Sequence, residues 1–441
     1  FDTMYTWFVN VSDGVFWTNE SYQFTTVPEA GGWWNTDWPY RRLVTIDHTL
    51  VSANLSSFPV LINMSDSDLA VHAQGDGDDV VFTGYYGERL DHEIEFYDDS
   101  SGHLVAWVKV PVLSAVNDTL LYVYYGNPSC SSQENSGGVW DVHYMMVHHL
   151  EETSGVHVDS TIHGNDGTPM GSLDQDVGGM VDGAVGFDGV DDFVEVSNDL
   201  SLGMGGGDVM TVCVWCKRGD LGSTDSLVEQ YDWAAGKGSF IFRKDGQMLQ
   251  FAVVQGQSWS PRVEKDNVFS DTDKMYHCVG MYDGSVIRLF VDGVEVASQS
   301  LSGGMLDSST SLAVGVRGDT KDMNFVDGVL DEVRLSNVSR SGDWVNVSFV
   351  NQRDPDGFVS VGVEEVGLSR PVVSNESPVD GSVDVAVDLS NLSFDLTDFQ
   401  GDSMNYSVET VPDIGFDSRT DVYNGTFSVS VSGLQYDTVY T

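Results

Sequence analysis

The sequence predicts an all-β protein built from tandem antiparallel β-sandwiches. Short runs that alternate apolar and polar residues recur along the 441 residues, and they are rich in Val, Tyr, Phe and Thr. Gly, Asp and Asn separate these runs. Asp-Gly pairs at 245, 283 and 292 stand between alternating runs, which is the strongest short-range signal for a hairpin. Helical periodicity is nearly absent, so antiparallel sheets are expected throughout.

Individual elements follow from these patterns. The clearest predicted strands, in chain order, are 43–46, 58–62, 104–110, 120–125, 209–215, 240–243, 286–291 and 329–335. One short helix is expected at 341–351, because Ser341 can cap its first turn and Asp354-Pro355 would end it.

Three stretches rich in Gly, Ser or Pro, at 27–32, 129–138 and 367–371, predict the domain boundaries. They divide the chain into pieces at 1–27, 33–130, 138–366 and 368–441. The first piece is too short to fold alone. The last piece stops within a strand pattern, so both ends are expected to be parts of larger domains.

Charge restricts the possible partners. The chain has 20 Lys and Arg against 68 Asp and Glu, a formal charge of −48, which would repel nucleic acid and anionic membrane surfaces. With 41% hydrophobic residues the chain can still form packed cores. No stretch has the 18 or more apolar residues that a membrane span needs, so no membrane insertion is expected in this segment. The acidity fits both calcium binding and adaptation to salt.

Glycosylation motifs indicate an extracellular or cell-surface location. Roughly three Asn-x-Ser/Thr acceptors are expected by chance, with composition bias as the alternative explanation of any excess. The chain has eleven, at Asn10, Asn19, Asn54, Asn63, Asn117, Asn337, Asn346, Asn375, Asn391, Asn405 and Asn424.

The cysteines predict one or two disulfides in an exported chain. There are four, Cys130, Cys213, Cys216 and Cys278, without the spacing of a metal site, and they allow three pairings that the sequence cannot decide among.

Residues 33–128 carry a distinctive series of strand motifs. These include Tyr40-Arg41-Arg42 at the start, Trp107-Val108-Lys109-Val110, and Tyr124-Tyr125-Gly126-Asn127-Pro128 at the end. The series resembles an uncharacterised β-sandwich domain of archaeal and bacterial cell-surface proteins. The resemblance implies a fold and no chemistry.

Residues 140–365 contain seven blocks in the order found in laminin-G-like, concanavalin A-like jelly rolls. They include VHHLEETSG from 147, AVGFDGVDDFVEV from 184 and DGVLDEVRLSN from 327. Residues 371–441 resemble an immunoglobulin-like or fibronectin-type-III-like domain that lacks its last strands. Residues 1–26 resemble the last two strands of such a domain.

The jelly-roll resemblance implies a structural calcium site. Members of the family often bind calcium where the turn at Asp159 meets the strand of Asp331, so Asp159 and Asp331 are the expected carboxylate ligands and Asn165 a further oxygen donor. Solvated carboxylates that stabilise glycine-rich turns are the alternative.

Two loops are candidates for glycan binding, because aromatic side chains suit the apolar face of a pyranose. The candidate residues are Tyr231, Trp233, Trp259 and Arg262, and packing over a strand edge is the alternative.

Catalysis is not expected. Glycoside hydrolases on this scaffold use paired carboxylates on one inward strand, and residues 140–365 have no such motif. Glu93 and Glu95 alternate, but we interpret them as an exposed strand face of the preceding domain. His148 and His149 are adjacent in a strand and are expected to point to opposite faces.

These observations favour a structural or adhesive extracellular glycoprotein in a cell-surface layer or fibre. Its expected partners are copies of itself, joined head to tail when residues 1–26 complete the domain at 368–441, or further domains of a longer chain. A lectin-type surface module is the first alternative. A glycoside hydrolase on a concanavalin-like scaffold is the second.

Overall fold

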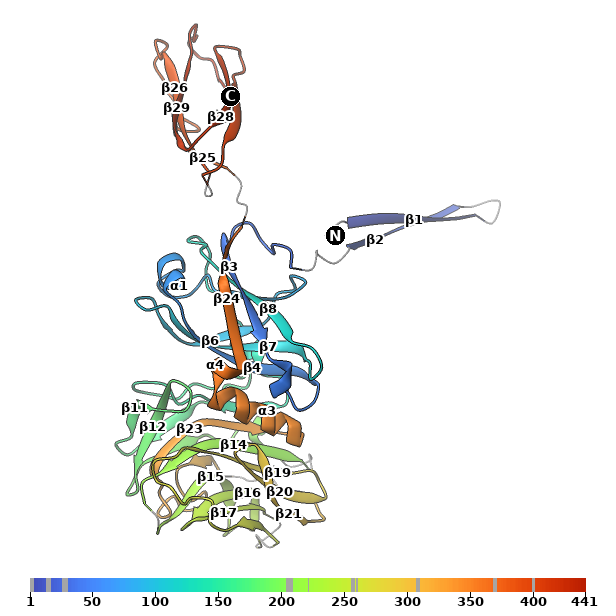
Figure 1. The fold of residues 1–441 in the computed structure, drawn as a ribbon, viewed down its shortest axis with the longest axis vertical. Helices are drawn as coiled ribbons and strands as arrows, with labels where there is room; N and C mark the ends of the chain where they lie inside the picture. The colour runs from blue at the N-terminus through green and yellow to red at the C-terminus, as the bar shows by residue number, and fades with distance from the viewer. Residues whose placement is uncertain are drawn as a thin grey trace. The chain divides into compact units, whose positions relative to one another are not determined.

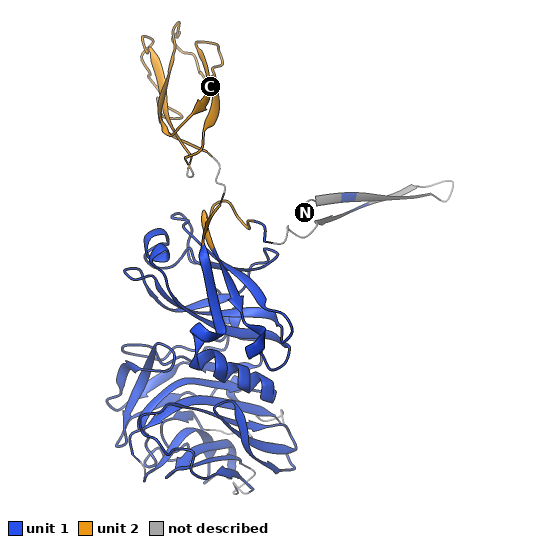
Figure 2. Cartoon of the chain, in the orientation of Figure 1, with its two compact units in different colours: residues 1–32, 42–363 blue, residues 33–41, 364–441 orange. Residues whose placement is uncertain are grey.

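A computed structural model describes residues 4–12, 17–25, 31–203, 209–220, 222–254, 258, 261–306, 310–367, 371–398 and 401–441. Antiparallel strands dominate, so the prediction of an all-β protein is confirmed (Figure 1). The chain forms two compact units (Figure 2). Residues 1–32 and 42–363 form the first unit, and residues 33–41 and 364–441 form the second.

The first part of unit 1 is a sandwich of two sheets, which we call the first sandwich. One sheet has the order β24-β3-β8-β5 and the other β4-β7-β6. Its elements are β3 Tyr40–Ile46, η1 His48–Leu50, β4 Leu55–Ser65, α1 Ser67–His72, β5 Val81–Gly84, β6 His92–Asp98, β7 His103–Leu113, β8 Thr119–Tyr125 and α2 Ser136–Val139. The longest pairing joins β4 to β7, in a register that runs from Leu55 opposite Leu113 to Ser65 opposite His103.

The second part of unit 1 is a jelly roll of two larger sheets. One sheet has the order β10-β13-β22-β15-β16-β17-β18, and the other β11-β12-β23-β14-β19-β20-β21, with β9 paired to β23. The elements are β9 Tyr144–His148, β10 Gly167–Met170, β11 Asp174–Gly178, β12 Gly183–Asp188, β13 Phe193–Val196, η2 Leu200–Leu202, β14 Met210–Arg218, β15 Thr224–Asp232, β16 Lys237–Asp245, β17 Met248–Val253, β18 Val263–Lys265, β19 Tyr276–Tyr282, β20 Val286–Val291, β21 Val294–Ser300, β22 Leu312–Val314 and β23 Asp327–Ser336.

The Asp-Gly pairs at 245, 283 and 292 connect paired strands as predicted, between β16 and β17, β19 and β20, and β20 and β21. The glycine φ angles of these turns are 58°, 89° and 77°, a region that favours glycine because it has no Cβ.

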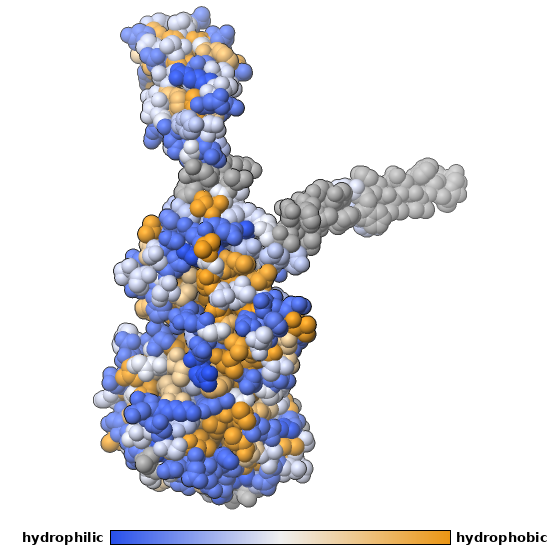
Figure 3. Space-filling view, viewed as in Figure 1, coloured by the Kyte–Doolittle hydropathy of each residue, from blue (hydrophilic) through white to orange (hydrophobic). Residues whose placement is uncertain are grey.

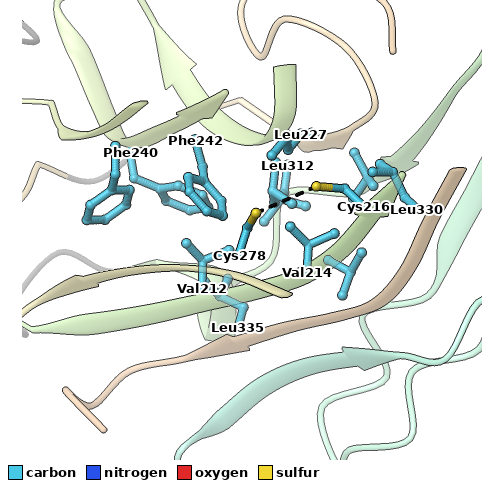
Figure 4. Packing of buried hydrophobic residues seen from close by; sticks show 14 of the residues in the cluster. Val212, Val214, Cys216, Leu227, Phe240, Phe242, Cys278, Leu312, Leu330 and Leu335 are labelled. Atoms are coloured by element: carbon cyan, nitrogen blue, oxygen red, sulfur yellow. Dashed lines mark hydrogen bonds between the residues drawn. The ribbon is translucent and has the colours of Figure 1, made fainter. Parts of the chain in front are cut away.

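Alternate residues of the two jelly-roll sheets point inward and form its core (Figure 4). Val212, Val214 and Cys216 of β14 and Cys278 of β19 face Phe240 and Phe242 of β16 in this core, and all are buried. The sulfur atoms of Cys216 and Cys278 lie 3.7 Å apart (Figure 4).

The last strand of unit 1 differs from the sequence-based assignment. The expected jelly-roll piece 138–366 included residues 359–366, but β24 (Val359–Val366) pairs with β3 in the first sandwich. The Asp47 amide donates to the Phe358 carbonyl at 3.1 Å, and the Arg42 guanidinium donates to the Gly362 carbonyl at 2.7 Å. Sequence order alone grouped this strand with its neighbours in the chain, whereas its hydrogen-bonding partner lies more than 300 residues earlier.

Helix α3 (Gly342–Arg353) leads the chain back from the jelly roll and is followed by α4 (Pro355–Phe358). The predicted cap is confirmed, since the Ser341 hydroxyl accepts a hydrogen bond from the Trp344 amide at 3.1 Å. The buried Asn351 side chain accepts from the Leu61 amide of β4 at 2.7 Å and donates to the Leu61 carbonyl at 2.9 Å. Asn351 therefore makes the two hydrogen bonds to the Leu61 backbone that a neighbouring strand would otherwise make.

Unit 2 contains a small module of two sheets, in the part of the chain that was expected to be immunoglobulin-like. One has the order β25-β26-β29 and the other pairs β27 with β28. The strands are β25 Val372–Ser377, β26 Asn391–Thr397, β27 Met404–Glu409, β28 Phe416–Val422 and β29 Gly425–Ser430. Within this unit the Gly367 amide donates to the Pro39 carbonyl at 2.8 Å, and Arg41 forms an ion pair with Glu365 at 2.7 Å.

Near the N-terminus, β1 (Met4–Ser12) and β2 (Trp17–Thr25) form a two-stranded antiparallel hairpin. Asn10 lies opposite Asn19 in its register. No helix among the described residues has the length and apolar character to cross a membrane.

Replacing Asn351 with Ala should leave the buried Leu61 amide and carbonyl without partners. Each lost partner costs about 1–3 kcal/mol, so the free energy of unfolding of unit 1 should fall by about 2 kcal/mol or more in denaturant titrations of the full chain. Ser348→Ala on the same helix is the control and should change it by less than about 0.5 kcal/mol. Equal stabilities of the two variants would contradict this role of Asn351.

Candidate functional site

The first sandwich and the jelly roll meet in a shared hydrophobic cluster. Leu61, Val105 and Trp107 of the first sandwich pack with Trp140, Tyr144, Val147 and Val181, and with the partly buried Met180 and Trp344. A group of charged side chains is enclosed beside this cluster. We call it the interface charge cluster, and its members are Glu93, Glu95, His149, Asp331, Glu332 and Arg334.

Strand β6 supplies Glu93 and Glu95 to this cluster, so the interpretation of these residues as an exposed strand face is wrong. Glu93 is 9% exposed and the Glu95 side chain 0%. The Trp140 indole donates to Glu93 at 2.8 Å, and the Trp107 indole donates to Glu95 at 2.6 Å. The register of β6 against β7 is irregular between Ile94 and Phe96, and both carboxylates reach His149 of the jelly roll.

Strand β23 supplies three charged residues because a β-bulge interrupts its alternation. Opposite β14, Asp331 pairs with Trp215 and Arg334 with Cys213, so that two residues of β23 oppose one residue of β14. Glu332 is the residue with a positive φ, 53°. Leu330, Val333 and Leu335 remain in the jelly-roll core. The charged residues between these core positions can therefore face the first sandwich together.

His149 connects the carboxylates of the two domains. Its Nδ1 lies 2.8 Å from Glu332 Oε1 and 3.3 Å from Glu95 Oε2, and its Nε2 lies 3.5 Å from Glu93 Oε2. The ring also stacks on Trp107, with 5.8 Å between ring centroids. The adjacent His148 instead contacts the Asn165 carbonyl at 2.8 Å, so the two imidazoles have separate partners.

Arg334 is the second cation of the cluster. Its Nε donates to Glu332 at 2.8 Å, and its guanidinium lies over the rings of Trp107 and Trp140, 4.2 and 4.7 Å from their centroids. Arg334 is buried, and its contacts with aromatic faces compensate part of its lost hydration.

Burial and neighbouring charges shift the pKa values of the cluster in different directions. Burial would lower the pKa of His149, but the carboxylates of Glu332, Glu95 and Glu93 raise it well above its usual value. Burial raises the pKa of Glu95 and Asp331 well above the usual value, and the nearby Glu332 carboxylate adds to both shifts. Burial would also raise the pKa of Glu332, but Arg334 and His149 lower it.

These shifts describe a cluster with balanced charge. Burial would raise the pKa of Glu93, but His149 lowers it, so Glu93 and Glu332 are the two anions and His149 and Arg334 the two cations. The raised pKa values of Glu95 and Asp331 favour their protonated, uncharged forms. The arrangement can join two domains without leaving an unpaired buried charge, which would be strongly destabilising. No pattern in the sequence indicated this role.

The predicted calcium ligands lie in different surroundings. Asp159 accepts hydrogen bonds from the Val147 amide at 2.9 Å, from the amide and hydroxyl of Thr161, and from the Asn165 amide at 2.8 Å. Asp331 instead accepts from the Met180 and Val181 amides at 2.6 and 3.2 Å. The structure thus brings Asn165 to Asp159 and places Asp331 in the interface charge cluster. Calcium binding stays a prediction.

Three groups among the described residues place ligand atoms of three side chains close enough for a metal ion. They are Asp47, His48 and Asp118; Glu95, His149 and Glu332; and Asp188, Asp191 and Asp192. In each group, carboxylates already accept hydrogen bonds from backbone amides or histidine, as Asp118 Oδ1 does from His48 Nδ1 at 2.6 Å. These contacts explain the positions of the residues without a cation.

The glycan-binding candidates differ in their exposure to solvent. Tyr231 is 3% exposed, packs with Ile241, Ala252 and Val254, and accepts a hydrogen bond from Arg317 at 2.9 Å, so its ring is not available for stacking on a sugar. Trp233 is partly exposed, Arg262 forms an ion pair with Glu264, and Trp259 lies outside the described residues.

Two open grooves lie elsewhere on the jelly roll. One has a volume of about 450 Å³ and is lined by Met180, Trp215, Lys274, Met275, Asp292, Phe349 and Arg353. The other has a volume of about 390 Å³, and its mixed lining includes the charged residues Asp188, Lys217 and Asp327. Neither groove could be predicted from the sequence, because each combines residues from distant parts of the chain.

Most described glycosylation motifs are accessible. Six of their asparagines are exposed, namely Asn54, Asn117, Asn375, Asn391, Asn405 and Asn424, and three are half-buried, namely Asn63, Asn337 and Asn346. The side chains of Asn10 and Asn19 lie outside the described part of the structure. No disulfide joins the four cysteines in this structure, and disulfide formation stays a prediction.

Family comparisons identify two parts of the chain. A family model described as the concanavalin A-like lectin/glucanases superfamily matches residues 188–346, and one described as a domain of unknown function (DUF2341) matches residues 76–166. The concanavalin-like jelly roll predicted from the sequence is thereby confirmed. The first description covers lectins and glucanases alike, so the expectation that the chain is not an enzyme stays a prediction. No curated protein matches the chain.

A search of solved structures found several distant matches, three of which follow. The botulinum neurotoxin serotype D binding domain is 10% identical (67% of this chain, 80% of that chain, TM-score 0.39). Domain 4 of a GH43 extracellular arabinanase from Geobacillus stearothermophilus, in complex with arabinotriose, is 17% identical. The match covers 46% of this chain and 97% of that chain, with a TM-score of 0.35. The binding domain of Paraclostridial Mosquitocidal Protein 1 is 12% identical. The match covers 66% of this chain and 92% of that chain, with a TM-score of 0.39. Similarities this distant do not indicate a function for this chain.

The charge cluster makes the stability of unit 1 depend on pH. Because Glu95 and Asp331 have raised pKa values in the folded chain, their contribution to stability is lost as pH rises from about 4 through the folded values. The contribution of His149 is complete below about pH 6.5 and is lost as pH rises through its raised pKa. All three groups therefore lower the stability of unit 1 as the pH rises into the alkaline range.

Glu95→Gln should resemble the native protein at pH 6 and melt at a higher temperature than the native protein at pH 9, because glutamine imitates the protonated carboxyl and has no proton to lose. Glu332→Gln is the matched control. It should lower the melting temperature at both pH values, since removing one partner of a buried ion pair leaves the other charge uncompensated and costs about 3–5 kcal/mol. Calorimetry of the full chain measures both, and equal losses in the two variants would contradict the assignment of the proton to Glu95.

Proposed function

We propose that this chain is a segment of an extracellular structural and adhesive array, in which the jelly roll is a ligand-binding head carried by the first sandwich. The jelly roll begins after β8 and ends before β24, and both of these strands belong to one sheet of the first sandwich. The jelly roll is therefore an insertion into the sandwich and not a bead between two linkers.

This insertion is the observation that carries the proposal. Within unit 2 the Gly367 amide is bonded to the Pro39 carbonyl, so the chain approaches and leaves the β3 and β24 strand pair at the same end. Tension along an array would pass between these adjacent strands. The jelly roll would stay outside the line of tension and remain folded to hold a ligand.

The surface supports an extracellular location. Hydrophilic residues cover much of the visible face in Figure 3, as expected for a chain with a formal charge of −48. The six exposed acceptor asparagines are available to a glycosylating enzyme. The interface charge cluster would keep the head in a fixed orientation on the first sandwich, because separating the two would expose paired charges and Trp107 together.

A screen of the full chain on a glycan array tests the head function. The chain should bind at least one extracellular glycan. A variant that breaks the connection between head and sandwich, such as Glu332→Gln, should not abolish binding, because the jelly roll has its own core. If no glycan is bound, the head function is excluded and the structural function alone remains.

Assembly of the array is proposed to occur by strand complementation. The immunoglobulin-like module has only five strands among its described residues, and Phe394, Tyr406 and Phe427 form a partly exposed aromatic cluster. A module with exposed strand edges can accept a hairpin from another copy. The β1 and β2 hairpin, with nine residues in each strand, has a suitable size.

Deleting residues 1–26 should abolish self-association of the purified chain if the hairpin completes the module of the next copy. Light scattering and electron microscopy would compare the deleted and the full chain at the same concentration. The alternative within this proposal is that the missing strands belong to the same polypeptide. Polymers that persist after the deletion, or a monodisperse monomer with the hairpin present, would refute exchange between copies.

A further inference from the structure

The groove of about 450 Å³ on the jelly roll combines an apolar lining with two cations. Met180 follows β11, Trp215 lies on β14, Met275 precedes β19, and Phe349 lies on α3. The rings of Trp215 and Phe349 stack with 5.7 Å between centroids, and the Trp215 indole donates to Gln352 at 2.6 Å. Trp215 and Phe349 thus form a floor of the groove that packing holds in place. Met180 and Met275, which are half-buried, lie beside this floor.

Lys274 and Arg353 bring positive charge to this groove. Lys274 Nζ lies 2.5 Å from Asp292 Oδ2 and 4.5 Å from the centroid of the Tyr276 ring. The exposed Arg353 guanidinium lies over the Phe349 ring, 5.2 Å from its centroid, and has no acidic partner among the described residues. With one carboxylate and two cations the groove has a net charge of +1, on a chain whose formal charge is −48.

We infer that this groove binds a carboxylate-bearing sugar residue of an extracellular glycan, such as a uronic acid. This inference rests on the proposed head function and specifies its ligand. Arg353 and Lys274 would hold the carboxylate, and Asp292 would accept hydrogen bonds from ring hydroxyls. The apolar side chains of Met180, Met275 and Phe349 would contact the apolar face of the ring.

Charge and size favour this ligand over others. Acidic surroundings would repel an anion at most places on the chain, so a local positive site selects the anion that fits it. A volume of about 450 Å³ is within the range of small-ligand pockets and holds one or two pyranose rings. An extended acidic peptide would need a longer groove, and it is the alternative outcome of the test.

The experiment compares methyl β-D-glucuronide with methyl β-D-glucoside, which differ in the carboxylate, by saturation-transfer NMR and calorimetry with the full chain. The glucuronide should bind, and the glucoside should bind about tenfold more weakly or not at all. Arg353→Gln and Lys274→Gln should each remove the preference for the glucuronide. Lys265→Gln removes the same charge from an exposed position on β18 and should leave the preference unchanged.

Several outcomes would overturn this inference. They are equal binding of the two sugars, an equal effect of Lys265→Gln, and tighter binding of a glutamate-rich peptide than of the glucuronide. Melting curves of the three variants should coincide, which separates lost contacts from lost folding. A glycan-array ligand whose binding is unchanged by Arg353→Gln would leave the head function intact and exclude this groove, whereas the absence of any glycan ligand would refute the head function itself.

Discussion

The ion pair of His149 with Glu332 organises the boundary between the two largest parts of this protein. Its atoms are 2.8 Å apart and almost completely shielded from water, so each charge needs the other. Arg334 adds the second positive charge from the jelly roll, and Glu93 adds the second negative charge from the first sandwich. A network divided between two domains in this way is satisfied only when they are docked in one arrangement, which favours a single orientation of the jelly roll.

The bulge in β23 shows how local backbone geometry makes that network possible. A regular strand would send Asp331 and Glu332 to opposite faces, and one carboxylate would enter the jelly-roll core among Leu330 and Val333. The positive φ of Glu332 has a conformational cost of about 1–3 kcal/mol. That cost is offset where Glu332 meets both Arg334 and His149.

Sequence patterns predicted much of the fold because those patterns are local. Alternation located the strands, Asp-Gly pairs located three hairpins, and Ser341 located the start of α3. The failures involve contacts between distant residues. Alternation placed Glu93 and Glu95 on one face of β6, but it could not show that the jelly roll covers this face. Similarly, the sequence of residues 359–366 does not indicate that this strand pairs with β3. The two acids before Arg334 in an otherwise alternating strand were the one available signal of the bulge.

The two kinds of site on the jelly roll differ in how their charges are paired and solvated. In the interface charge cluster every ionised group has an opposite charge beside it and water is excluded, which suits a permanent contact between domains. In the groove at Arg353 a cation is exposed and lacks an acidic partner among the described residues, so its hydration can be exchanged for a ligand carboxylate. A buried, balanced cluster stabilises one structure, whereas an exposed and unbalanced charge beside an apolar floor leaves binding free energy available to a ligand.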